Sequence, residues 1–326
     1  MSQNDPMIIT VLTAPGEGEP PGIEAIRERA EVRMAWDEAT LRETLPGTQV
    51  MMVTDFRTEA LAAAWPCADR LKWIHATSAG VDALMFPALI DSDVVVTNAK
   101  GIFDRTIAEY VLCTILMFAK DFPNSMRFQQ ETRWQHRDTE RAQGQQVLVV
   151  GAGSIGRQIG RLVTAIGMKA DGIARRARPD DPDFNAVHSQ DDLFDHLATA
   201  DYVVIAAPLT PQTEGLFNGE AFAAMKPTAR LINIGRGPVV RTDDLVTALE
   251  CGQIAGAALD VFEQEPLPPE HPLWSMKNVI MTPHMSGDFI GWRHALTEQF
   301  LDNFDQWKAG QGLFNEVDKA LGYAAG

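Results

Sequence analysis

Short apolar runs alternate with helix-length stretches along most of this chain, and this alternation constrains the fold more than any other feature of the sequence. One series of β-rich runs occupies the first hundred residues, and a second series begins near residue 147. Such alternation is typical of parallel sheets with crossover helices. A length of 326 residues suits two domains of about 150 residues each. We therefore predict an α/β protein with two sheet units.

The expected elements follow from residue type and run length. The first-series strands are Met7–Leu12, Glu31–Met34, Val50–Thr54, Lys72–His75 and Val94–Thr97. The second-series strands are Val147–Val150, Ala170–Ala174, Tyr202–Ala206, Leu231–Ile234, Ala257–Val261 and Val279–Met281, apolar enough to be covered on both faces. Thr106–Lys120 reads as a largely buried helix and Gly291–Ala309 as a second helix, which could return to the first unit.

Charge and composition exclude several classes of partner. The formal net charge of −16 would repel nucleic acid and anionic membranes. The longest apolar run, Tyr110–Ala119, is too short to span a bilayer. The N-terminus shows no basic stretch followed by an apolar one, so a cytoplasmic location is expected. Cys67, Cys113 and Cys251 are widely spaced and suggest neither a disulfide framework nor a metal site.

A glycine-rich loop, GAGSIG, follows the run Val147–Val150 directly and precedes a helical pattern. In a dinucleotide fingerprint the three glycines permit the tight turn, the approach of the pyrophosphate and the close packing of helix on strand. The helix that follows should hold the phosphates at its N-terminus and bury one face. The expected cofactor residues are Gly151, Gly153, Ser154, Ile155 and Gly156, and the expected buried face is Ile155, Ile159, Leu162 and Ile166.

The end of the next strand indicates which dinucleotide binds. An NAD site places an acidic residue about 20 positions past the glycines, whereas arginine accommodates the 2′-phosphate of NADP. Ala174 stands 18 positions after Gly156, and Arg175, Arg176 and Arg178 follow it. Asp171 should point to the opposite face of the sheet. Although a solvated basic turn is the alternative, we expect NADP to be preferred, with Arg175 and Arg176 on the phosphate and NAD still able to bind.

An arginine, a carboxylate and a histidine follow in order near the ends of later strands, where ligands collect in α/β sheets. Arg236 lies between two glycines, Glu265 in LDVFEQEP and His284 in MTPHMSGD. Arginine can bind a carboxylate bidentately, and histidine can protonate a carbonyl oxygen as hydride arrives. Singly, each could be an ordinary surface or loop residue. The remaining histidines have no comparable setting and are expected to be core or surface groups.

These segments resemble the D-isomer-specific 2-hydroxyacid dehydrogenases, a family that includes glyoxylate/hydroxypyruvate reductases and the core of phosphoglycerate dehydrogenase. The matching segments are SAGVD, NAKGIFDRTIAEYV, GAGSIG, PLTPQTEGLFN, MKPTARLINIGRG, ALDVFEQEP and TPHMSG. The resemblance implies that Arg236, Glu265 and His284 are catalytic and that Ala79, Gly80 and Val81 bind the substrate carboxylate. It also implies cofactor contacts from the residues Thr106, Pro208, Thr210 and Asp260.

The resemblance further implies an architecture and an activity. A Rossmann dinucleotide-binding domain, 104–289, would be inserted into a flavodoxin-like α/β substrate domain, 1–103 with 290–326, and two chains would form a homodimer through their nucleotide domains. The expected activity is hydride transfer between NADP(H) and a 2-ketoacid or D-2-hydroxyacid such as glyoxylate or hydroxypyruvate. The regulatory extension of many phosphoglycerate dehydrogenases is not expected here, nor is feedback control by serine.

Two other functions stay open at this point. Related formate dehydrogenases pair the histidine with an amide, so Glu265 argues against formate oxidation. A dinucleotide-sensing corepressor could keep the same three residues without turnover. The preferred ketoacid cannot be read from the sequence: Phe56 could shape the substrate pocket or simply pack. Trp134 could reach an active site, its own or that of a dimer partner, but packing under a loop is the favoured interpretation.

Overall fold

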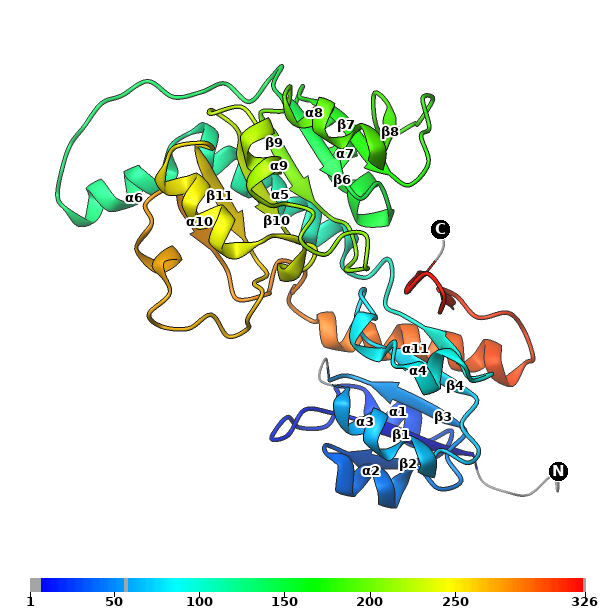
Figure 1. The fold of residues 1–326 in the computed structure, drawn as a ribbon. Coiled ribbons are helices and arrows are strands. Elements are labelled where there is room, and N and C mark those ends of the chain that lie inside the picture. The colour runs from blue at the N-terminus through cyan, green and yellow to red at the C-terminus, as the bar shows by residue number, and fades with distance from the viewer. Residues whose placement is uncertain (1–6, 56–57, 325–326) are drawn as a thin grey trace. The chain divides into compact units, whose positions relative to one another are not determined.

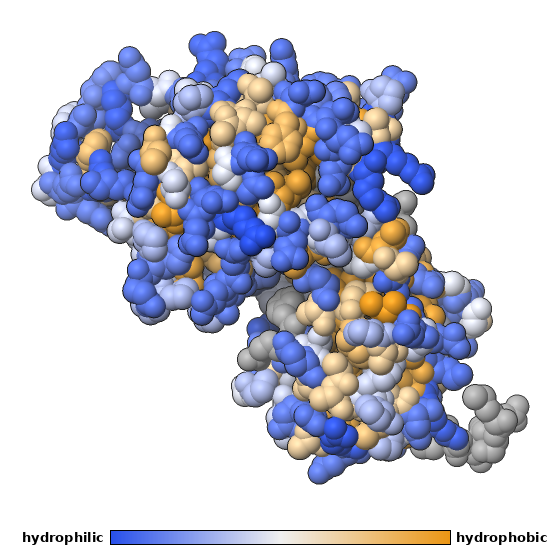
Figure 2. Space-filling model, in the orientation of Figure 1, coloured by the Kyte–Doolittle hydropathy of each residue, from blue (hydrophilic) through white to orange (hydrophobic). Residues whose placement is uncertain are grey.

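The computed structural model describes residues 7–55 and 58–324, so Phe56 lies outside the described residues. The chain divides into two compact units. One comprises the residues up to Ile102 together with those from Phe289 onward, and the other comprises Phe103–Asp288. Figure 1 shows the ribbon of each unit, and in Figure 2 hydrophilic residues cover most of the visible surface with apolar patches between them. No helix in the described ranges is both long and apolar enough to span a membrane.

The first unit contains a five-stranded parallel sheet in the order β2-β1-β3-β4-β5, the doubly wound order of flavodoxin-like folds. Every first-series strand predicted from the sequence is present, with ends that differ by at most one residue. The strands are β1 Ile8–Leu12, β2 Glu31–Ala35, β3 Val50–Val53, β4 Trp73–Ala76 and β5 Val95–Thr97. The helices are α1 Ile23–Arg27, α2 Glu38–Thr44, α3 Glu59–Ala64, α4 Pro87–Ile90 and α11 Trp292–Lys308.

Helix α11 belongs to this first unit, although it follows the second sheet in sequence. Its Phe300 and Phe304 are fully buried against Ile9 and Val11 of β1 and Trp73 of β4. The Trp73 and Phe300 rings stack with centroids 5.3 Å apart. Burial of aromatic side chains of this size contributes about 1.5–3 kcal/mol each. The chain beyond α11 adds a short antiparallel pair, β13 Val317–Asp318 and β14 Tyr323–Ala324.

The second unit contains a seven-stranded parallel sheet in the order β12-β11-β10-β9-β6-β7-β8. The order reverses at β6, so the crevice beside its carboxyl end is the expected ligand position. The strands are β6 Gln146–Val150, β7 Lys169–Ala174, β8 Val187–Ser189, β9 Tyr202–Ile205, β10 Arg230–Asn233, β11 Gly256–Leu259 and β12 Val279–Met281. Strand β8 was not predicted, because its three residues, Val187–Ser189, are too few and too polar to form an apolar run.

Six helices of the second unit have the bounds α5 Asp104–Ala119, α6 Phe122–Gln130, α7 Ser154–Ala165, α8 Leu193–Leu197, α9 Gly219–Ala224 and α10 Thr242–Glu250. Short 3-10 turns occupy Trp65–Cys67 and Asp82–Leu84 in the first unit, and Gln190–Asp192, Gly237–Val239 and Pro272–Ser275 in the second. The predicted buried helix Thr106–Lys120 corresponds to α5, which packs against α7. The three cysteines are free thiols, of which Cys113 and Cys251 are exposed.

The predicted buried face of α7 is partly wrong. Ile159 is buried, but Ile166 is 38% exposed, and Val163 is buried in its place. Gly156 and Gly160 complete the buried face. A Cβ at Gly160 would lie 2.6 Å from the carbonyl oxygen of Asp183. The absence of a side chain at Gly160 therefore lets α7 pack closely against the Asp183 backbone. The apolar spacing alone pointed to a face that is rotated about the helix axis from the one that packs.

The fully buried His75 in β4 should make the first unit sensitive to acid. Its Nδ1 lies 2.8 Å from the Thr97 hydroxyl, while Nε2 has no hydrogen-bond partner. Burial disfavours the charged ring and lowers the pKa of His75 to about 3. Below pH about 6.5 the unfolded chain therefore binds a proton that the folded chain does not, which costs up to about 1.4 kcal/mol per pH unit. We expect His75→Phe to lose less stability than the wild type between pH 7 and pH 5 in urea titrations; parallel losses would contradict this assignment.

Candidate active site

The glycine loop between β6 and α7 has the geometry of a phosphate-binding turn. Gly151 has φ +108°, a conformation that L side chains rarely adopt. A Cβ at Gly156 would lie 2.1 Å from the Gly151 carbonyl oxygen, whereas a Cβ at Gly153 would meet only open space. Gly153 is the N-cap of α7 and provides no side-chain cap, so the first amides of this helix can receive an anion. These observations fit the pyrophosphate of a dinucleotide.

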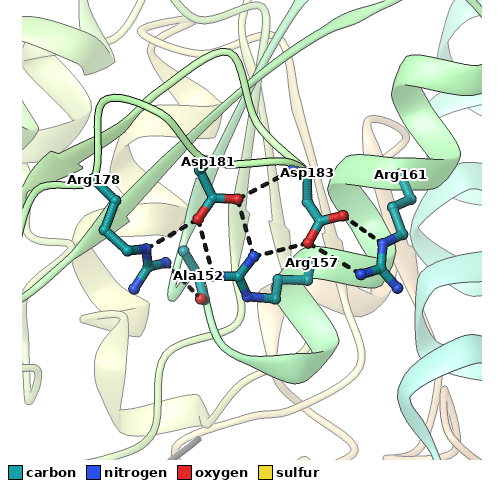
Figure 3. Close-up of polar contacts among 6 residues, drawn as sticks. All are labelled: Ala152, Arg157, Arg161, Arg178, Asp181 and Asp183. Carbon is teal, nitrogen blue, oxygen red and sulfur yellow. Dashed lines mark hydrogen bonds and ion pairs between the residues drawn. The ribbon is translucent and has the colours of Figure 1, made fainter.

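The loop after β7 carries two exposed arginines and also Asp181 and Asp183, the buried carboxylates of an ionic network that Figure 3 shows. The half-buried Ala174 ends the strand, and Arg175 and Arg176 follow it on the surface. The Arg178 side chain points elsewhere: its Nε donates to Asp181 and its Nη2 donates to the carbonyl oxygen of Ala152, each at 3.0 Å. Arg178 therefore ties the loop to the glycine turn.

Arg157 and Arg161 of α7 complete the same network. Arg157 lies 2.9 Å from Asp181 and 2.8 Å from Asp183, and Arg161 also pairs with Asp183. The Arg161 hydrogen bond is the largest cause that lowers the pKa of Asp183. Burial by itself raises the pKa of Asp181, but hydrogen bonds from the Asp183 amide, Arg157 and Arg178 outweigh it and lower this pKa. Both buried carboxylates stay charged and are neutralised by the more exposed arginines. Nothing in the sequence pointed to Asp181 and Asp183, because neither directly follows a strand.

His284 and Glu265 form a hydrogen-bonded pair in the second unit. The His284 Nδ1 and Glu265 Oε2 atoms are 2.8 Å apart, and the other carboxylate oxygen accepts the Phe262 amide at 2.9 Å. Burial raises the pKa of Glu265, but the bonds from His284 and Phe262 and the charge of Arg236 outweigh it, so this pKa is lowered. The carboxylate therefore stays ionised and holds the imidazole ring of His284 in place.

Buried Asp260 fixes the loop that carries His284. Its Oδ1 accepts the Thr282 hydroxyl at 2.6 Å and the Met285 amide at 2.9 Å, and its Oδ2 accepts the Ser286 amide at 3.0 Å. The His284 amide donates to the Asp260 carbonyl oxygen, which helps to hold His284 at φ +52°. Tyr110 of α5 adds a 2.8 Å bond to the Thr282 hydroxyl. The family resemblance implied that Asp260 contacts the cofactor and gave no sign of this supporting role.

Arg236 begins the turn after β10 and lies close to the same segment. A Cβ at Gly237 would come within 1.9 Å of the Phe262 backbone, so the turn packs directly against the chain that leads to Glu265. The Arg236 guanidinium is half-buried, donates to the Gly235 carbonyl oxygen at 3.0 Å and lowers the pKa of Glu265 by its charge. The structure thus brings Arg236, Glu265 and His284 into one neighbourhood.

The other predicted cofactor residues lie on loops and helix starts of the second unit. Pro208 and Thr210 follow β9, where the Thr213 hydroxyl donates to the Pro208 carbonyl oxygen and accepts the Thr210 amide. Thr106 is half-buried in the first turn of α5. Thr213, which shapes this loop, was missed because a hydroxyl bond across a turn leaves no spacing signal.

The predicted carboxylate-binding residues lie in the first unit, after β4. The Asn98 side chain donates to the Ala79 carbonyl oxygen and the Ser78 hydroxyl to that of Gly80, both at 2.6 Å. Val81 is buried. The amides of Ala79, Gly80 and Val81 have no hydrogen-bond partner among residues 7–55 and 58–324. Successive amides of this kind suit an anion.

Comparison with known proteins agrees with this geometry. The model of the D-isomer specific 2-hydroxyacid dehydrogenase NAD binding domain matches residues 112–286. The glyoxylate reductase of Thermococcus onnurineus is 31% identical over 304 residues, covering 89% of this chain and 90% of the relative. Two solved structures are similar over 98% of this chain and 100% of their own. A D-isomer specific 2-hydroxyacid dehydrogenase from Xanthobacter autotrophicus in complex with NADPH and MES has 31% identity and a TM-score of 0.83. An NADPH-dependent glyoxylate/hydroxypyruvate reductase from Sinorhizobium meliloti in complex with NADP and sulfate has 27% identity and a TM-score of 0.84.

The fold and these likenesses define an NAD(P)-binding oxidoreductase. The chain belongs to the D-isomer specific 2-hydroxyacid dehydrogenase family and is similar to glyoxylate reductases. The family resemblance and the α/β class with two parallel sheets, both predicted from the sequence, are confirmed.

Proposed function

We propose that this protein is an NADPH-dependent reductase of small 2-ketoacids, glyoxylate and hydroxypyruvate among them, that acts reversibly as a D-2-hydroxyacid dehydrogenase. The observation that carries the proposal is the His284–Glu265 pair with Arg236 beside it, in the unit that also holds the glycine loop. The unit up to Ile102 with the residues from Phe289 onward is assigned to the substrate and Phe103–Asp288 to the nucleotide. The family membership and the similarity to glyoxylate reductases support this assignment.

The roles of the side chains follow from their chemistry. Arg236 binds the substrate carboxylate, and the amides of Ala79, Gly80 and Val81 are further proposed donors to carboxylate oxygens. NADPH held at the glycine loop would supply hydride chemistry for C2 of the ketoacid. His284 gives its proton to the oxygen that becomes the hydroxyl, and Glu265 holds the ring by its hydrogen bond to Nδ1. In the reverse direction His284 accepts that proton.

The cofactor preference rests on the end of β7. No carboxylate follows Ala174 directly, and the nearest buried acids, Asp181 and Asp183, are already paired with arginines. Arg175 and Arg176 are exposed beside the position expected for the ribose 2′-oxygen. Solved relatives from two organisms contain NADPH or NADP. We therefore propose NADP as the preferred nucleotide, with NAD bound more weakly.

The decisive experiment is a steady-state assay of the purified protein. Loss of NADPH absorbance at 340 nm is measured with glyoxylate, hydroxypyruvate and a panel of bulkier 2-ketoacids, and kcat/KM is compared across the panel. We expect turnover with at least one small ketoacid. Tight NADPH binding without turnover across the panel would instead support a dinucleotide-sensing protein of the corepressor type. NAD reduction with formate would support formate oxidation.

Exposed apolar side chains on and after α6 support a homodimer through the nucleotide unit. Phe122 and Met126 are 53% and 55% exposed, and Trp134 is fully exposed, so its predicted packing under a loop is wrong. Apolar groups gathered on a surface mark contact sites between proteins. We expect light scattering to give twice the chain mass, and Met126→Glu to shift the protein towards the monomer. A wild-type monomer at micromolar concentration would contradict the dimer.

A further inference from the structure

Three potential metal ligands converge on one face of the nucleotide-unit sheet, at its β8 edge. Asp171 belongs to β7, His188 to β8 and His196 to α8. The sheet register pairs His188 with Ile173, two residues after Asp171, so both side chains project from the same face of the sheet. Leu193 and Leu197 of α8 pack with Ile173 on this face, which brings His196 alongside. Figure 1 shows β7, β8 and α8 together in this unit.

The three side chains are close enough to share one ion. Each offers one ligand atom, and these atoms all lie within 4.8 Å of one another. The rings of His188 and His196 stack with centroids 3.7 Å apart. The Gln146 side-chain amide donates to one oxygen of Asp171 at 2.7 Å, which orients the carboxylate. All three residues are half-buried, so a bound ion would be shielded from solvent while water could still complete its coordination.

We propose that Asp171, His188 and His196 form a binding site for a divalent transition-metal ion, with Zn²⁺ as the best-suited occupant. Two imidazoles and one carboxylate are a common protein ligand set for Zn²⁺, with water in the fourth position. Tetrahedral coordination at 2.0–2.1 Å places ligand atoms about 3.4 Å apart. Ligation therefore requires one of the two stacked imidazole rings to turn, so that both ring nitrogens point at the ion. Carboxylates that bind a metal are usually held by a hydrogen bond of their own, as the Gln146 side chain holds Asp171.

Acidic residues near the three ligands would attract a cation, and a bound cation would link three elements of the fold. Three exposed acids lie in the same short segment, namely Asp191, Asp192 and Asp195. They add to an overall charge of −16, which attracts cations to this edge. The edge strand β8 has three residues, and it is held by pairing with β7 and by a bridge between Val187 and Arg178. An ion bound by one residue from each element would join β7, β8 and α8 and stabilise the folded state by mass action.

Calorimetric titration of chelator-treated full-length protein with Zn²⁺ tests the site. We expect one Zn²⁺ per chain, and an affinity reduced about 10–100-fold or more by His188→Gln, His196→Gln or Asp171→Asn. His136→Gln, which changes an exposed histidine in the segment after α6, is the matched control and should bind Zn²⁺ as the wild type does. Circular dichroism and NADPH binding verify that each variant is folded.

A second measurement uses the wild type alone and does not depend on folded variants. Histidine-detected NMR should show one equivalent of Zn²⁺ shifting the ring signals of two of the seven histidines, while the signals of the other five stay in place. The thermal midpoint should rise with added Zn²⁺. The proposal is overturned if Zn²⁺ does not bind, if His284 is among the shifted signals, or if His188→Gln and His196→Gln leave the affinity unchanged. None of these outcomes bears on ketoacid reduction, which the 340 nm assay tests separately.

Discussion

Replacing His284 by glutamine is expected to lower kcat for 2-ketoacid reduction by about 10²–10⁴-fold, the usual contribution of a general acid. Glutamine keeps a polar side chain near Glu265 but cannot deliver a proton at neutral pH. NADPH affinity should change little, because the glycine loop and the arginines after β7 are untouched. Steady-state kinetics at saturating NADPH, with fluorescence titration of the cofactor, separates the two effects. Unchanged turnover would remove His284 from the mechanism.

The chain offers a matched control in a second histidine–glutamate pair. His294 and Glu298 of α11 are 3.4 Å apart on the exposed surface of the first unit. His294→Gln should retain full activity. Glu265→Gln should be less damaging than His284→Gln, because the glutamine oxygen can still accept a hydrogen bond from the ring and only the negative charge is lost. A larger loss of kcat in Glu265→Gln than in His284→Gln would contradict this order.

The fold was predictable because its signals are local. The apolar runs Val147–Val150 and Tyr202–Ile205 are buried on both faces in the structure, so their composition alone marked them as strands. The short strand β8 was not predictable, since its three residues include a histidine and a serine and gain their strand geometry from tertiary pairing with β7 and Arg178. The wrong face of α7 has a similar origin: glycines set the packing, and glycines carry no hydrophobic signal.

The site was predictable to the extent that its residues follow strands. Arg236 comes shortly after β10 and His284 shortly after β12, and parallel strands bring such positions to one sheet edge. The partners that hold them depend on tertiary contacts. Asp260 supports the His284 loop through backbone amides, and nothing in its sequence setting shows which amides those are. Likewise, Asp171 and His188 are neighbours only because of the sheet register.

Replacing Arg175 and Arg176 together by alanine is expected to raise KM for NADPH by about 10–100-fold and KM for NADH little. A hydrogen bond between charged groups contributes about 1.5–3 kcal/mol. Arg175 and Arg176 are exposed to solvent at the end of β7, which reduces their contribution to the binding of the 2′-phosphate. Only the 2′-phosphate distinguishes the two nucleotides, so the ratio of their KM values isolates this contact. Equal increases for both nucleotides would defeat the assignment.

Arg178→Ala is the informative comparison for that experiment, because Arg178 contributes to the loop in a different way. It joins Asp181 to the Ala152 carbonyl oxygen and so supports the glycine turn that both nucleotides would share. Its loss should weaken NADPH and NADH by similar factors. If Arg178→Ala instead discriminates between the nucleotides and the double variant does not, the phosphate-binding role belongs to Arg178. The ionic network around Asp181 would then be part of the cofactor site rather than its support.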